Sequence, residues 1–298
     1  MTVIDPVAVI PPEDAPPARP VWWRALLADR TALVALVLLV LIVLAAIFAP
    51  LISPYNPEAN SRAVMQPPVW MERGDWNHLL GTDGQGRDLL SRVFYGTRLT
   101  LLIGLVAVGI GGVIGAGLGL LAAMYPRVDP WMMRVNDMML SFPAILLGLA
   151  LVAVMGPGVL PVIIALAVAS IPDCARIARS IGLGVMGQEY IEAGRAVGLS
   201  NSAIFRKYLL RNAISSILIY LSLRFGQIIL IGAALSFLGL GARPPAAELG
   251  MMAAQGRDFL LFAPHIVVVP CVAIFVIVLC ANILGDALRD VLDPRLQG

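Results

Sequence analysis

A short polar stretch carries many of the side chains with which this chain could bind a partner in water. Residues 192–212 read EAGRAVGLSNSAIFRKYLLRN and hold Glu192, three arginines and the only lysine of the chain. Helix formers over residues 189–197 predict one short helix, which Gly198 ends. Ser200 then caps a second helix that runs to Asn212. The pattern is typical of a docking surface rather than of a catalytic centre.

Two interpretations of this stretch remain open. It suits an ordinary solvated loop lying on a membrane surface, and it equally suits a pair of docking helices that fit a groove in a soluble partner. Both use an apolar stripe at helical spacing with basic side chains beside it. The stripe is Ile204, Tyr208 and Leu209, and the basic residues are Arg206, Lys207 and Arg211.

Catalytic and metal-binding patterns are missing from the sequence. A phosphate-binding loop needs G-x-x-x-x-G-K-[ST], but Lys207 follows Arg206 and precedes Tyr208. The cysteines, Cys174, Cys271 and Cys280, lie in or beside apolar stretches without the spacing of metal ligands, so we interpret them as packing residues. We therefore expect no catalytic residue, no metal, no cofactor and no nucleic-acid partner in this chain.

The composition predicts an integral membrane protein. The 298 residues are 59% hydrophobic and 13% charged, with a mean hydropathy of +0.87, whereas soluble domains carry about 25% charged residues. A spanning helix needs roughly 20 mainly apolar residues, and the charge-free stretches suit helices rather than barrel strands. These stretches are residues 31–57, 99–126, 138–172, 212–223, 225–242 and 259–285.

The lengths of these stretches predict an all-α protein with six transmembrane helices. Residues 138–172 are too long for one span, so we expect them to fold back at Gly156-Pro157-Gly158. Residues 212–242 form one span if Arg224 is tolerated inside it. A proton- or sodium-coupled carrier usually keeps carboxylates near the bilayer midplane, and the charge-free stretches contain none. Energy for any transport must then enter from another subunit.

Basic residues predict the orientation in the membrane. With the N-terminus inside, the inner segments hold thirteen Lys and Arg residues and the outer segments seven, so both termini are predicted to be cytoplasmic. The expected organisation begins with a cytoplasmic tail (1–30), a first transmembrane helix (31–53) and an outer segment (54–98). A core over 99–286 follows, with the inner loop 187–212 inside it, and then a cytoplasmic tail (287–298).

Two features of the spans invite paired interpretations. Arg224 lies deep in the fifth helix, where a charge facing lipid is costly. Arg224 and Gln227 therefore either make a structural hydrogen bond or salt bridge, or line a pathway and contact an anionic group such as a peptide carboxylate. Gly111, Gly115 and Gly119 recur every four residues on one helix face, where small residues permit close helix packing, within the chain or against another subunit. A lipid or ligand site is the alternative for this face.

Several motifs together resemble one family. Residues 192–198 (EAGRAVG), with Leu210 farther on, are similar to the EAA loop of ATP-binding-cassette importer permeases, whose pattern is EAA, three residues, G, nine residues, I-x-L-P. Glu192, Ala193, Gly198 and Leu210 match, whereas Gly194, Tyr208 and Arg211 depart from it. The stretches 78–104, 235–245 and 282–296 resemble the C-type permease subunit of dipeptide, oligopeptide and nickel importers.

The resemblance implies a type I ABC importer permease fold in the bacterial inner (plasma) membrane. It implies a homologous second permease subunit, two ATPase subunits that bind ATP and Mg, and a periplasmic or lipid-anchored substrate-binding protein. Residues Glu192, Ala193, Gly194, Arg195, Gly198 and Leu210 would couple this chain to the ATPases. The expected cargo is a dipeptide or oligopeptide, with nickel or metal chelates and glutathione as alternatives. A stand-alone channel or secondary carrier is the alternative from a different class.

The outer segment carries its own candidate site. Thr82 or Asp83 is expected to cap a helix that carries Arg87, Asp88 and Arg92, with Asp88 and Arg92 paired across one turn. This group would act as a structural cap or gate over the pore entrance, as a docking site for the substrate-binding protein, or as both. Residues 241–262 are expected to share that role.

Overall fold

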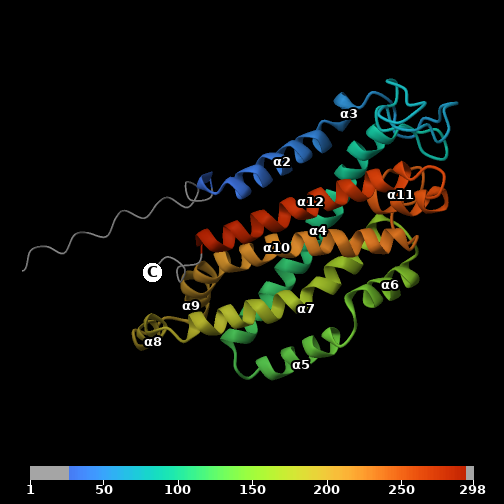
Figure 1. Ribbon diagram of the computed structural model, residues 1–298. Helices are drawn as coiled ribbons and strands as arrows, with labels where there is room; N and C mark the ends of the chain where they lie inside the picture. The colour runs from blue at the N-terminus through green and yellow to red at the C-terminus, as the bar shows by residue number, and fades with distance from the viewer. Residues whose placement is uncertain (1–26, 293–298) are drawn as a thin grey trace, which may run out of the picture.

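The computed structural model describes residues 27–292 and shows a bundle of long apolar helices (Figure 1). Within the described residues, five helices are long and apolar enough to cross a membrane. They are α2 (Arg30–Ile47), α4 (Leu89–Met124), α7 (Val159–Met186), the run Asn201–Phe237 that includes α10 (Leu210–Phe237), and α12 (His265–Leu292). The pair α5 (Asp129–Leu140) and α6 (Ala144–Met155) is bent by 84° and makes a sixth span when the two helices are counted as one. On that count the expectation of an all-α fold with six spans is confirmed.

The remaining elements are short and lie at the two ends of the bundle. They are α3 (Ala49–Ile52), α8 (Glu189–Ala196), α9 (Asn201–Ile204), the π-helical turn η1 (Phe205–Leu209), α11 (Leu249–Gly256) and the 3₁₀ turn η2 (Arg257–Phe259). The start of α2, the end of α12 and the hairpin of α8 and α9 lie at one end, and α3 and α11 lie at the other (Figure 1). The start of the first span and the end of the last span lie at the same end of the bundle because the number of spans is even.

Two helix boundaries in the first half of the chain differ from the expectation. The third span is not one continuous helix, because it breaks at Ser141, Phe142 and Pro143, and a proline disfavours helical geometry in the residue before it. Helix α4 begins at Leu89, inside the segment expected to be wholly outside the membrane. Its 36 residues span about 54 Å, which exceeds the roughly 30 Å hydrocarbon core, so its first turns lie beyond the bilayer.

The expected turn at residues 156–158 is present. Helix α6 ends at Met155, Gly156 adopts a φ of +84°, and α7 begins at Val159. The second helix of the polar stretch, by contrast, does not stop at Asn212. It continues through η1 into α10, so residues 201–237 form one run of 37 residues. The polar stretch is thus joined to a spanning helix without a break.

Helices α4 and α7 pack closely along the glycine stripe of α4. A Cβ atom added at Gly115 would lie 2.6 Å from the carbonyl oxygen of Ile171 and 2.8 Å from Cβ of Cys174. Gly111 and Gly119 approach the α7 backbone just as closely. The stripe serves helix packing within the chain, as small residues do in membrane bundles.

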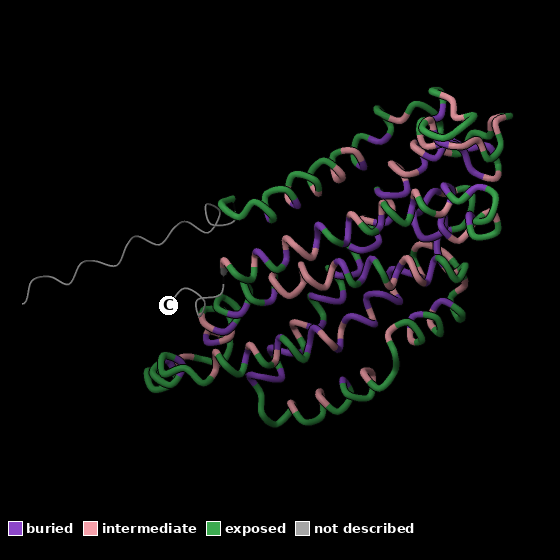
Figure 2. Tube along the Cα trace, viewed as in Figure 1, coloured by how far each residue is buried: buried purple, intermediate pink, exposed green. Residues whose placement is uncertain are grey.

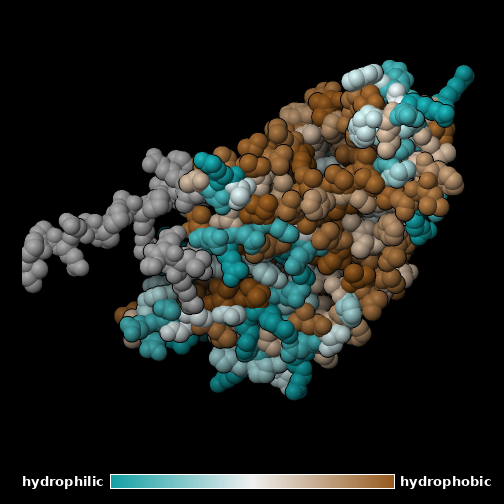
Figure 3. All heavy atoms as spheres, viewed as in Figure 1, coloured by the Kyte–Doolittle hydropathy of each residue, from teal (hydrophilic) through white to brown (hydrophobic). Residues whose placement is uncertain are grey.

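Exposed apolar side chains cover the outside of the bundle. Helix α2 buries only small residues, Ala32, Ala35 and Ala46, and Figure 2 shows it mostly exposed at the edge. Val113 and Phe275 are 73% and 62% exposed on other helices. In the face shown in Figure 3, apolar surface covers the upper and right-hand parts of the bundle, and hydrophilic surface gathers at the upper right end and over the lower left part, where it reaches toward the middle. Such a surface suits contact with lipid or with another membrane subunit.

Candidate functional site

The hairpin of α8 and α9 owes its sharp bend to Gly198. The amide of Leu199 donates to the carbonyl of Gly194 at 3.0 Å, and the amide of Gly198 donates to Arg195 at 3.0 Å. This is the bonding pattern of a Schellman helix end, which requires a left-handed residue, and Gly198 has a φ of +81°. Ser200 then caps α9 by accepting from the amide of Ala203 at 3.3 Å. The predicted helix stop and cap are both confirmed.

Buried side chains fix the hairpin to the inner ends of the spans. Ile191, Ile204 and Leu209 are fully buried, and they belong to one apolar cluster with Leu120 of α4 and Ala178 of α7. The rings of Tyr190 and Tyr208 also stack across the hairpin, with their centroids 5.8 Å apart. Since packed interiors transmit strain, this cluster joins the hairpin mechanically to the spanning helices.

The opposite side of the hairpin is open. Glu192, Ala193, Arg195 and Gly198 are exposed, and neither Glu192 nor Arg195 makes a side-chain hydrogen bond or ion pair with a described residue. Leu210, which begins α10, is 37% exposed. These side chains are available to a partner.

Gly194 is the buried member of the matched motif, and its surroundings explain why glycine suits this position. A Cβ atom added there would lie 3.3 Å from Cδ1 of Leu199, which is a tight contact. Leu199 is the residue whose amide closes the helix end, so a small residue at position 194 leaves room for it.

Arg224 forms an ion pair in the middle of the membrane-spanning region. Its Nη2 donates to the carboxylate of Asp173 in α7, and its Nη1 donates to Oε1 of Gln227 at 2.7 Å. Asp173 lies near the centre of α7 and Arg224 near the centre of α10. The structure therefore shows the hydrogen-bonded and ion-paired state that was one of the two expectations for Arg224.

The position of Asp173 shows that one expectation from the sequence, that the spans hold no carboxylate near the bilayer midplane, is wrong. The charge-free stretch ends at Pro172, but α7 continues through this proline as far as Met186, so a carboxylate does lie at mid-membrane depth. Nearby, Nδ2 of the buried Asn136 donates to the carbonyl of Pro172 at 3.0 Å and joins α5 to α7. A hydropathy window that tolerates one or two charges would have included Asp173 in the span.

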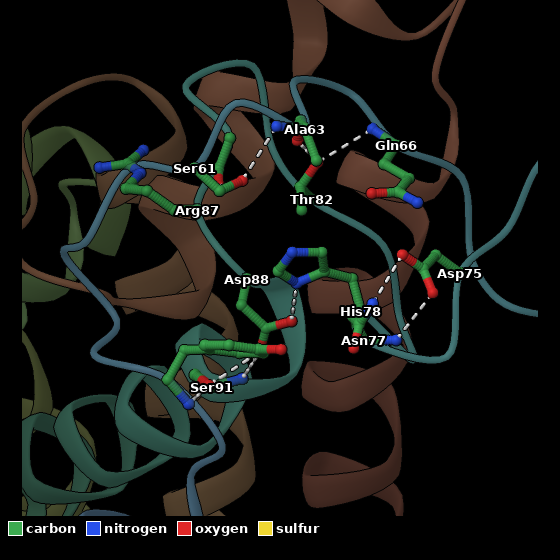
Figure 4. Close-up of polar contacts among 12 residues, drawn as sticks. Ser61, Ala63, Gln66, Asp75, Asn77, His78, Thr82, Arg87, Asp88 and Ser91 are labelled. Carbon is green, nitrogen blue, oxygen red and sulfur yellow. Dashed lines mark hydrogen bonds and ion pairs between the residues drawn. The ribbon is translucent and has the colours of Figure 1, made fainter.

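The outer segment is held together by buried charges (Figure 4). Asp88 caps α4 by accepting from the amide of Ser91 at 2.8 Å, and its other oxygen lies 2.9 Å from Nδ1 of His78. Thr82 instead accepts from the amide of Gln66 at 2.9 Å and donates to the carbonyl of Ala63. The expectation that Thr82 or Asp83 caps the helix is wrong, because the chain turns at residues 83–87 before the helix begins.

The expected pairing of Asp88 with Arg92 is also wrong. Asp83 contacts both arginines, with distances of 2.7 Å to Nε of Arg87 and 3.5 Å to Nε of Arg92. Arg92 is 1% exposed and donates from Nη1 to the carbonyls of Pro57 and Pro245 at 3.0 and 3.4 Å. It therefore joins the outer segment to the loop before α11.

Helix α11 is part of the same buried framework. Glu248 caps it by accepting from the amide of Met251 at 2.8 Å, and it also accepts from the hydroxyl of Thr100 at 3.2 Å. Nε2 of His265 lies 3.3 Å from the carbonyl oxygen of Thr82. At the exposed edge of the segment, the Asn77 side chain donates to Asp75 at 2.9 Å and holds the pKa of that carboxyl below its ordinary value.

A cavity of about 380 Å³ opens beside these charges. Its lining includes Asp83, Arg87, Gln255 and Phe259, and Nη2 of Arg87 donates to Oε1 of Gln255 at 3.2 Å. Within the described residues, no group of three or more His, Cys, Asp or Glu side chains could hold a metal ion.

Taken together, the apolar spans and the exposed, firmly anchored helical hairpin define a multi-pass membrane protein. Residues 115–298 match the family model described as the binding-protein-dependent transport system inner membrane component, and residues 21–68 match the N-terminal TM domain of oligopeptide transport permease C. The chain belongs to this family of ABC transporter permeases.

Individual relatives support the assignment. The chain is 41% identical over 278 residues to the di/tripeptide transport system permease protein DppC of Pseudomonas aeruginosa, covering 93% of this chain and 92% of the relative. It is 39% identical over 277 residues to the glutathione transport system permease protein GsiD of Pectobacterium atrosepticum, covering 93% and 91%. The MetNI methionine ABC transporter in an inward-facing conformation shares the fold, with a TM-score of 0.58 at 22% identity, covering 69% of this chain and 98% of that one.

Proposed function

We propose that this chain is the translocation subunit of an ATP-driven importer that carries dipeptides or oligopeptides across the inner membrane by alternating access. The observation that best supports this proposal is the similarity, over 92–93% of the chain, to permeases named for peptide transport. Glutathione is the second candidate cargo, because a similarly close relative is named for it. Glutathione is itself a tripeptide, so both candidates place an ammonium group and a carboxylate in the pathway.

The proposal includes partners that the family implies. A homologous second permease completes the pathway, two ATPase subunits bind ATP and Mg, and a substrate-binding protein delivers cargo from the outer side. The exposed face of α8 fits the cleft of an ATPase subunit, since Glu192 and Arg195 have no partner among the described residues. Closure of the ATPases would then tilt the hairpin and switch the access of the pathway.

The outer segment is proposed to cap the pathway. Asp83, Arg87, Asp88 and Arg92 are all buried, and they bond to the chain itself rather than pointing outward. This placement favours a structural cap over direct docking by these four side chains. The binding protein would then meet the exposed surface that they hold in place.

The coupling role can be tested with Glu192→Ala in the reconstituted transporter. Because Glu192 is exposed and its side chain makes no hydrogen bond or ion pair with a described residue, its loss should leave folding intact. We expect ATP hydrolysis to continue while peptide uptake per ATP falls by about tenfold or more, as for the loss of one charged contact. Uptake and phosphate release are measured on the same vesicles.

The matched control is Glu189→Ala, an exposed glutamate on the same helix but outside the matched motif. It should leave the ratio of uptake to hydrolysis unchanged. Normal coupling in the Glu192→Ala variant would contradict the proposed role of the hairpin.

A further inference from the structure

The Asp173–Arg224 pair lies on a polar face of the membrane-spanning bundle. Along α10, polar side chains recur three or four residues apart and so share one face: Asn212, Ser216, Tyr220, Arg224 and Gln227. The side chains of Arg224 and Asp173 are 12% and 35% exposed at this face. Charged groups at this depth are costly against lipid. The face must therefore open on water or on another subunit.

The pair leaves hydrogen-bonding capacity unused. Arg224 donates to Asp173 through Nη2 and to Gln227 through Nη1, whereas its buried Nε has no acceptor among residues 27–292. A guanidinium binds a carboxylate best through two parallel N–H groups. The Nε and Nη2 edge of Arg224 is thus only half used. A carboxylate that accepted from both nitrogens would satisfy it.

We propose that this pair is a binding site for the charged ends of a zwitterionic peptide. The α-carboxylate of the peptide binds Arg224, and its α-ammonium group binds Asp173, so that each end replaces one internal partner. The inference rests on the proposed function in peptide import and adds to it the residues that recognise the cargo within the pathway.

Charge balance is the physical reason for this specificity. The empty site is neutral because Arg224 and Asp173 compensate each other. When a zwitterion enters, every charge again has an opposite neighbour, so the exchange leaves no unpaired charge at this depth in the membrane. A peptide with only one charged end would leave Arg224 or Asp173 uncompensated, and an unpaired charge at this depth is unfavourable.

Selectivity among three matched peptides tests the proposal. The complete transporter, with its ATPases and binding protein, is reconstituted in vesicles, and uptake of alanyl-alanine, its N-acetyl derivative and its C-terminal amide is measured. In the Asp173→Asn variant we expect the ratio of N-acetyl to zwitterionic uptake to rise by about tenfold or more, the effect expected of one charged hydrogen bond. In Arg224→Gln, the corresponding ratio for the amide should rise. Since the binding protein is the same throughout, its own preference cancels in these comparisons.

The matched controls are Asp137→Asn and Arg176→Gln, which break an exposed ion pair of the same residue types with a distance of 2.6 Å. They should leave all three ratios at the wild-type values. If the variants at positions 173 and 224 reduce all three uptake rates equally, the pair is purely structural and the inference is overturned. If the wild-type transporter carries none of the three peptides although it hydrolyses ATP, the proposed peptide cargo fails instead.

Discussion

At the scale of single residues, Gly198 determines the shape of the hairpin of α8 and α9. Glycine is favoured at position 198 because of its backbone φ of +81° and not because of crowding, since nothing lies within 4 Å of a Cβ atom added there. We expect Gly198→Ala to cost about 1 kcal/mol at this turn, because a left-handed alanine is strained without any clash. The two amides that close the helix end, those of Gly198 and Leu199, should exchange hydrogen about fivefold faster.

Gly187→Ala is a suitable control for this measurement. Gly187 has an ordinary φ of −83°, and an added Cβ atom would come no closer than 3.6 Å to another heavy atom. Unchanged exchange in the Gly198→Ala variant would show that the turn tolerates a side chain and that the bend has another cause.

Local signals were predictable at this scale, and long-range partners were not. The stop at Gly198 and the cap at Ser200 follow from backbone chemistry within a few residues. The partner of Arg92 depends on a turn that brings Asp83 back beside it, and the sequence offered Asp88 at a more favourable helical spacing. Asp88 was already engaged by Ser91 and His78.

At the scale of elements, the contact between α4 and α7 depends on glycine. We expect Gly115→Ala to destabilise the protein by about 1–3 kcal/mol, because its Cβ atom would meet Ile171 and Cys174 at less than 3 Å. Gly117→Ala, two residues away, has nothing within 4 Å of the new atom and should be neutral or slightly stabilising. Thermal unfolding in detergent compares the two variants. Equal stability of the pair would show that the helices can separate without cost.

The elements were predictable where apolar length alone defines them. The six spans and the turn at Gly156 follow from hydropathy and from proline and glycine placement. The length of α7 could not be predicted from hydropathy. A span that is ended at the first charged residue stops before Asp173, and the sequence does not show that Arg224, far along the chain, neutralises Asp173. The break between α5 and α6 was likewise hidden, since Pro143 lies within an uninterrupted apolar stretch.

At the scale of the whole molecule, the chain should be inert by itself. Purified and reconstituted without its partners, we expect it neither to hydrolyse ATP nor to conduct or exchange peptides. Addition of the second permease, the ATPases and the binding protein should restore both activities. Because Asp173 supplies the kind of carboxylate that ion-coupled carriers use, the measurement should include an imposed proton gradient. Peptide accumulation driven by that gradient alone would favour a secondary carrier.

The continuity of residues 201–237 has a mechanical consequence. A helix of 37 residues is about 55 Å long, so it reaches from the cytoplasmic hairpin to the outer surface as one rod. A tilt of about 10° around its centre would displace each tip by about 5 Å, while Arg224, which lies about 7.5 Å from the centre, would move by only about 1 Å. If this helix pivots near the Asp173–Arg224 pair, the inner and outer entrances of the pathway can open in turn while a peptide bound at the pair stays nearly in place.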